Sequence, residues 1–139
     1  MAITSRRARE LLYAAHDAWN DRDIDRLLAL YHEDMSFWAN IGGADGTPLV
    51  IEGKSAFRRQ LLKWAEMEGA SEPQSFRFEN GVGRANVEFY IHDLETGHRH
   101  VLTFRQVATY RADKIFRLEE YHDAPTLAAF NALVSNRSG

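Results

Sequence analysis

The sequence predicts an α+β fold: a cone-shaped, curved antiparallel sheet wrapped around N-terminal helices, with a pocket inside. Two observations support this. Apolar residues recur at helical spacing in the first half of the chain, whereas the second half contains long β-favouring segments joined by short turns. Helices followed by strands are typical of α+β architecture, in which the helices pack on one face of the sheet. At 139 residues, the chain is expected to form one domain, residues 1–139.

Three helices are expected first. Residues 5–20 carry an apolar stripe at helical spacing. A short second helix should follow Asp23, a suitable N-terminal cap, with apolar positions at helical spacing through Tyr31. A third helix should begin after Gly53 and end at Gly69.

The sheet is expected mainly from the second half of the chain. Residues 35–39 and 49–51 predict two early strands on either side of a glycine-rich loop. Four antiparallel strands should follow at about 74–80, 84–93, 98–111 and 115–122, before a closing helix at 125–134 that Asp123 can cap. The strand at 98–111 exceeds the usual length of about five or six residues, so it must bend and curve the sheet.

The last two turns predict the register, because opposed residues of a hairpin share a face. A four-residue loop at 94–97 and a three-residue loop at 112–114 place the following residues on the face toward the helices: Val87, Phe89, Ile91, Leu102, Phe104, Gln106, Leu118, Glu120 and His122. The opposite face would carry Tyr90, Arg105, Val107 and Tyr121, among others. A buried polar group without a hydrogen bond costs about 1–3 kcal/mol. The three polar residues of the apolar face therefore predict a wet or ligand-filled cavity.

Composition argues against several classes of protein. The net charge of −3 gives no reason to expect a nucleic-acid partner, which requires a clustered basic surface. There is no cysteine, so thiolate catalysis and disulfides are excluded. No apolar stretch reaches the ~20 residues that cross a bilayer, so no membrane partner is expected. No signal-peptide pattern is present at the N-terminus, and the expected location is cytoplasmic.

Four segments of the sequence resemble one family. They read AWNDRDID at residues 18–25, LYHEDMSF at 30–37, IEGKSAF at 51–57 and KIFRLEEYHD at 114–123. In these segments the chain resembles the nuclear transport factor two-like superfamily, particularly its SnoaL-like and ketosteroid-isomerase-like branch. The resemblance implies a single SnoaL-like domain with a cystatin-like α+β barrel, a pocket between helices and sheet, and a homodimer formed through the outer face of the sheet.

The positions that the resemblance assigns to catalysis do not match a standard ketosteroid isomerase. The three isomerase positions fall on Ala15, Ala39 and Gln106, none of which has the required acid or base. Epoxide-hydrolase-like members place a carboxylate where Glu120 stands, but their companion arginine-x-aspartate is absent. SnoaL-type polyketide cyclases place a carboxylate acid/base near the end of the same strand, a role that Glu120 or Asp123 would fill.

Glu120 and His122 are the candidate catalytic residues. Burial in an apolar pocket would bring a glutamate toward the range useful for general acid/base chemistry, and a nearby histidine can share its proton. The alternative for Glu120 is a structural pairing with Gln106. The candidate substrate-binding residues are Gln106, Phe104, Phe89, Trp38 and His16, of which His16 is alternatively a hydrogen-bonded boundary residue.

No metal and no cofactor are expected. His98 and His100 form an H-x-H pair, which binds a metal only if further ligands converge, and no acidic partner is evident in the sequence. The leading hypothesis is a small-molecule enzyme that performs cyclisation, dehydration, isomerisation or hydrolysis on a hydrophobic substrate. The alternative is a non-catalytic ligand-binding module or a dimeric interaction module with the same fold.

Overall fold

The computed structural model describes residues 2–138, and their side chains as far as Val134. It has the predicted α+β class, with helices followed by a curved six-stranded sheet. The elements are α1 (Ser5–Asn20), α2 (Ile24–Leu28), β1 (Tyr31–Ala39), η1 (Ala44–Gly46), β2 (Leu49–Glu52), α3 (Lys54–Trp64), β3 (Ala70–Glu79), β4 (Val82–His92), β5 (Arg99–Arg111), β6 (Lys114–Tyr121) and α4 (Ala124–Ser138).

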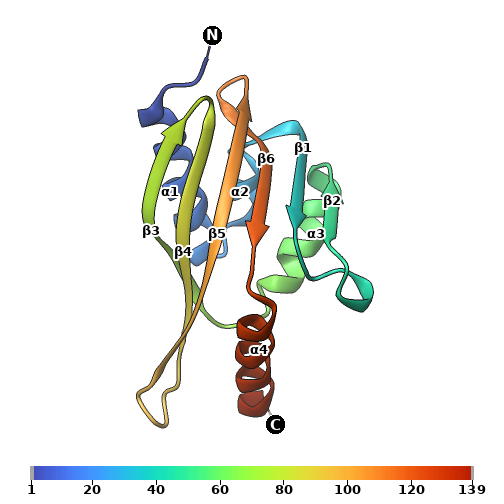
Figure 1. Cartoon of the computed structure of the whole chain (residues 1–139), viewed down its shortest axis with the longest axis vertical. Helices are drawn as coiled ribbons and strands as arrows, with labels where there is room; N and C mark the ends of the chain where they lie inside the picture. Colours follow the sequence, from blue (N-terminus) through green and yellow to red (C-terminus); the bar gives the residue numbers. More distant parts are fainter. Residues whose placement is uncertain (1, 139) are drawn as a thin grey trace.

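The strand order is β2-β1-β6-β5-β4-β3, so the last strand in the sequence lies inside the sheet. Neighbouring strands are antiparallel except β1 and β6, which run parallel. Helices α1, α2 and α3 lie against one face of the sheet, while α4 stands beyond the end of β6 (Figure 1). The space between these helices and the sheet contains the hydrophobic core, in which Leu11, Phe37 and Ile115 are at most 1% exposed.

The hairpin register confirms the predicted facing of the sheet. Phe89 pairs with Leu102 and Gln106 pairs with Glu120, as the turn lengths predicted. The prediction of a three-residue loop at 112–114 was wrong. Arg111 pairs with Lys114, so the turn contains only Ala112 and Asp113, with φ of 51° and 65°. Two residues with positive φ form the tight turn that suits a two-residue hairpin. A shift of register after Thr109 absorbs the difference, which restores the predicted pairing.

Several element boundaries differ from the prediction. Helix α3 ends at Trp64 rather than at Gly69. Helix α2 ends at Leu28, and Tyr31 begins β1, where it pairs with Ile115 of β6. Its buried ring packs against Phe57 with ring centroids 5.2 Å apart. Strand β3 begins at Ala70, and the register shifts between Pro73 and Ser75. A proline in a sheet favours such an irregularity because it has no N–H to donate.

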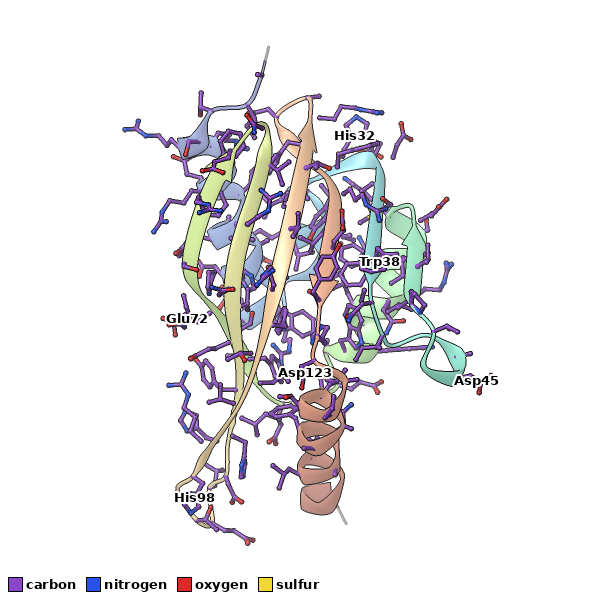
Figure 2. The ribbon with its side chains drawn as sticks, in the orientation of Figure 1. His32, Trp38, Asp45, Glu72, His98 and Asp123 are labelled. Atoms are coloured by element: carbon purple, nitrogen blue, oxygen red, sulfur yellow. The ribbon has the colours of Figure 1, made fainter. Side chains whose placement is uncertain are left out.

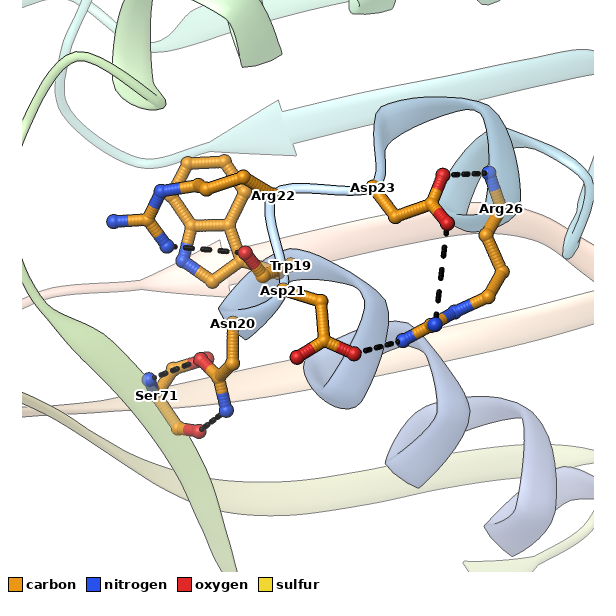
Figure 3. Close-up of polar contacts among 7 residues, drawn as sticks. All are labelled: Trp19, Asn20, Asp21, Arg22, Asp23, Arg26 and Ser71. Carbon is orange, nitrogen blue, oxygen red and sulfur yellow. Dashed lines mark hydrogen bonds and ion pairs between the residues drawn. The ribbon is translucent and has the colours of Figure 1, made fainter.

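Arg22, in the turn between α1 and α2, is hydrogen-bonded to the segment that connects α3 and β3. It adopts a positive φ of 55°. Its guanidinium donates hydrogen bonds to the carbonyl oxygens of Trp19 (3.0 Å), Met67 (2.8 Å) and Gly69 (2.8 Å). It also lies over the Trp19 ring, 4.5 Å from the centroid (Figure 3). This turn therefore holds both Trp19 and the segment carrying Met67 beside the interior of the fold.

Candidate functional site

A cavity of about 340 Å³ lies between the helices and the concave face of the sheet. That volume is within the range of small-molecule sites, about 300–1,000 Å³. Eight aromatic side chains line it, including Trp19, Phe37, Phe89 and Phe104. Among the residues the structure describes, no lysine or arginine lines the cavity, and Glu120 is its only carboxylate. The cavity therefore favours a ligand with apolar surface and no phosphate group.

One wall of the cavity carries a continuous chain of hydrogen-bonded polar side chains. Ser71 Oγ lies 2.6 Å from His16 Nδ1, and His16 Nε2 lies 2.9 Å from Gln106 Oε1. Gln106 Nε2 donates to Glu120 Oε2 at 2.8 Å, and Glu120 Oε1 lies 3.2 Å from His122 Nε2. We call these five residues the polar chain. They come from α1, β3, β5 and the end of β6, so only the folded sheet brings them together.

The end of β6 holds the two candidate catalytic side chains in place. The His122 ring stacks on Phe104, with centroids 4.6 Å apart. Asn40, directly after β1, accepts from the His122 backbone N–H (2.8 Å) and donates to its carbonyl (2.9 Å). The side chains of Glu120 and His122 are only 17% and 11% exposed. Within the described residues, His122 Nδ1 is buried and has no hydrogen-bond partner.

His16 is a neutral histidine at neutral pH. Burial lowers its pKa, an effect that its hydrogen bond to Gln106 and the charges of Glu120 and Asp17 oppose only in part. Burial disfavours the imidazolium because a charge loses its hydration there. The imidazole therefore carries a single proton and serves as both donor and acceptor within the polar chain.

The lowered pKa of His16 predicts a loss of stability in mild acid. Below the ordinary pKa of 6.5, this histidine is protonated to a greater extent in the unfolded chain than in the folded chain. The unfolded state then binds more protons, so the free energy of unfolding should fall as the pH falls below about 6.5. Urea denaturation from about pH 7.5 to about pH 5 should show a steeper fall in the wild type than in His16→Gln. Equal slopes would contradict a neutral His16.

Most of the predicted site residues lie around this one cavity. Glu120, His122, Gln106, Phe104 and Phe89 line it from the sheet. His16 lines it from the helical side and is bonded within the polar chain. The predicted pairing of Glu120 with Gln106 is present, so their hydrogen bond belongs to the cavity wall itself.

The prediction that Trp38 forms a wall of the pocket was wrong. Its ring packs beside that of Tyr121, 5.2 Å between centroids, on the face of the sheet away from the helices (Figure 2). Along β1 alternate residues are buried, so Phe37 and Ala39 point inward and line the cavity instead. Successive side chains of a strand point to opposite faces, which makes the two orientations exclusive.

Asp123 is a capping residue rather than a second acid of the cavity. Its carboxylate accepts from the Thr126 hydroxyl (2.6 Å) and backbone N–H (3.1 Å) at the start of α4. These two hydrogen bonds lower the pKa of Asp123, which is exposed and does not line the cavity. Of the two carboxylates that the family resemblance allowed, only Glu120 lies in the pocket.

Three further residues of the site were missed by sequence reasoning: Asn40, Ser71 and Tyr31. Tyr31 lines the cavity, where burial, and then the charge of Glu120, raise the pKa of its phenol and keep it protonated. Ser71 lies 55 positions from His16, and no periodic pattern relates the two. Asn40 follows a strand whose place in the sheet depends on β6, at the far end of the sequence.

The histidines outside the cavity do not form a metal centre in the described part of the chain. Among those residues, no group of three or more His, Asp or Glu side chains could hold a metal ion. In the β4–β5 hairpin, His100 Nε2 lies 4.0 Å from Asp93 Oδ2, a contact between two residues only.

No helix within the described residues is both long and apolar enough to span a membrane.

The sequence matches a family model, and the structure resembles several solved structures. The family model of the SnoaL-like domain matches residues 12–118. TerC, co-crystallised with polyporic acid, superposes with a TM-score of 0.74 at 21% identity, covering 93% of this chain and 98% of TerC. A nuclear transport factor two-like protein of unknown function from Burkholderia pseudomallei gives 0.72 at 14% identity, covering 89% and 96%. A proposed polyketide cyclase from Xanthomonas campestris pv. campestris gives 0.62 at 21%, covering 89% and 96%. No curated protein matches the sequence.

Proposed function

Because this chain belongs to the family of SnoaL-like domains, we propose that it is an enzyme of cofactor-independent acid/base chemistry. Its substrate would be a small, hydrophobic molecule with a carbonyl group, bound in the cavity. The observation that carries the proposal is Glu120: a carboxylate on an aromatic wall, with one oxygen bonded to Gln106 and the other beside His122. Such an arrangement suits general acid/base catalysis.

The proposed step is removal of a proton next to the carbonyl. An oxygen of Glu120 forms the new O–H bond as the substrate C–H bond breaks. The electron pair of that bond forms a C=C bond, and the carbonyl oxygen becomes an enolate oxygen. Return of the proton to another carbon gives isomerisation. Departure of a hydroxyl, protonated by Glu120 or His122, gives dehydration with release of water. The neutral phenol of Tyr31, which lines the same cavity, is a candidate donor to the enolate oxygen.

Two of the structural relatives support a small-molecule role. TerC was crystallised with polyporic acid, and the Xanthomonas protein is a proposed polyketide cyclase. The lining of this cavity agrees with an aromatic or polyketide-like ligand, because aromatic side chains bury large apolar area against flat rings. The absence of lysine and arginine from the described lining favours an uncharged ligand.

The proposal can be tested before any natural substrate is known. 5-Nitrobenzisoxazole is a flat, uncharged aromatic compound that reports a general base: removal of its C–H proton forms a nitrile as the N–O bond breaks, and a coloured phenolate leaves. The wild-type protein should accelerate this reaction over acetate, a carboxylate in water, by about 10²–10⁴-fold at the same pH. If the compound quenches tryptophan fluorescence, which Trp19 and Trp64 on the wall make possible, yet gives no acceleration, the domain binds without catalysis and the proposal fails.

A further inference from the structure

The polar chain has a direction, which is fixed at its Glu120 end. While ionised, a carboxylate can only accept hydrogen bonds, so the Gln106 amide must turn its NH₂ group to Glu120 Oε2. The amide oxygen then faces His16 and needs a donor, which places the imidazole proton on Nε2. His16 Nδ1 is left as an acceptor, and it takes the hydroxyl proton of Ser71. Ser71, His16 and Gln106 then each have a single assignment.

The far end of the chain is anchored to the same helix that carries His16. Asn20, one helical turn later on α1, accepts from the Ser71 backbone N–H (2.8 Å) and donates to the Ser71 carbonyl (2.9 Å) (Figure 3). Asn20 thus fixes the backbone of Ser71 while His16 bonds its side chain. His16 is 6% exposed and Ser71 5% exposed, so bulk water cannot replace a lost partner for either.

We infer that Ser71, His16 and Gln106 are positioning residues. Gln106 donates to Oε2 of Glu120, and His16 and Ser71 hold the Gln106 amide in that orientation, so Oε1, the oxygen beside His122, is the one that exchanges the proton. The amide of Gln106 keeps a hydrogen on the Oε2 side, so a new proton is accommodated on Oε1 without rearrangement of the chain. Coupling of this kind is reciprocal: the charge of Glu120 selects the tautomer of His16, and that tautomer orients the amide that holds Glu120. The assignment of Oε1 as the reacting oxygen rests on the proposed function, whereas the polarity of the chain does not.

The test is NMR of the histidine ring nitrogens, which distinguishes a protonated nitrogen from a bare one and needs no substrate. In the wild type at neutral pH, His16 should show a protonated Nε2 and a bare Nδ1. In Glu120→Gln the new amide can accept from Gln106 or donate to it. The hydrogen bonds of the polar chain can then run in either direction, with the His16 proton on Nε2 or on Nδ1. The two His16 nitrogen signals should then shift toward each other as the tautomers mix. Glu119→Gln, a neighbouring change on the outer face, should leave them unshifted.

A wild-type His16 protonated on Nδ1 would overturn the inference. So would a Glu120→Gln spectrum unchanged from the wild type, because the polarity would then be set at the Ser71 end. Ser71→Ala provides a second variant: it removes the donor to Nδ1 and should also shift the signals of His16. Because no turnover enters these measurements, a protein that fails the benzisoxazole assay but shows the expected shifts would lose the proposed function and retain the polarity of the chain.

Discussion

Replacement of Glu120 by glutamine is expected to lower the rate of benzisoxazole elimination by about 10²–10⁴-fold, the usual contribution of a general base. An amide has nearly the shape of the carboxylate but cannot take a proton. The new amide oxygen can still accept from Gln106, and the new NH₂ group can donate to His122 Nε2 once the imidazole hydrogen moves to Nδ1, so the cavity should keep its shape. The loss should therefore appear in kcat, with little change in KM or in the melting temperature.

Glu119→Gln is the matched control for this variant. Glu119 precedes Glu120 in β6 but lies on the other face, where it bonds Arg117 (3.1 Å) and the hydroxyl of Tyr121. Its replacement removes the same charge from the same strand and should leave the elimination rate near that of the wild type. A Glu120→Gln protein as fast as Glu119→Gln would show that the base lies elsewhere.

Phe37→Ala should produce the largest loss of stability of the variants considered, about 3–5 kcal/mol. Phe37 is 1% exposed and packs against both Phe57 and Trp64, with centroids 5.6 Å apart in each pair. Truncation removes buried apolar area and leaves a hole beside the existing cavity. Thermal denaturation should show a melting temperature lower by roughly 10–15 °C, given the size of the domain.

Trp38→Ala tests the facing of β1 by comparison with its neighbour. Trp38 is half-buried on the outer face beside Tyr121, so its removal creates no internal cavity. The melting temperature should change much less than in Phe37→Ala, although more atoms are removed. If Trp38→Ala were the more damaging substitution, the assignment of Phe37 to the interior would be incorrect.

The sequence was most informative where the strands are joined by hairpins. In β4, β5 and β6 the facing follows from counting residues across two turns, and it placed Gln106 opposite Glu120 correctly. The error of one residue in the last turn did no harm, because the irregularity after Thr109 compensates for it. Strand β1 runs parallel to β6, and the loop at 40–48 that joins it to its antiparallel neighbour β2 is too long for such a count. The local signal for Phe37 was the alternation of Met35, Phe37 and Ala39 with Ser36 and Asn40, which the large apolar ring of Trp38 obscures.

Ser71, which supports His16 at the far end of the polar chain, could not be predicted for a similar reason. Ser71 lies ahead of Pro73, where the sequence pattern of a strand is interrupted, and the predicted strand began only at residue 74. Its contacts with His16 and Asn20 connect β3 to α1 across more than 50 positions. Long-range hydrogen bonds of single polar groups leave no periodicity in a sequence, whereas apolar faces do. The cavity and its Gln106–Glu120 pair could therefore be predicted, whereas the contributions of Ser71 and Asn40 could not.

The central position of the last strand has a consequence for how the domain assembles. Strands β1 and β2 form one part of the sheet and β3, β4 and β5 another, and only β6 joins them. Until β6 docks, both parts have an open edge of the kind that recruits other chains. Closing the sheet also requires contacts between positions some 80 apart, which makes folding slow. Glu120 lies in β6 and His122 follows it directly, so the candidate catalytic residues reach the cavity in the same folding step that completes the sheet.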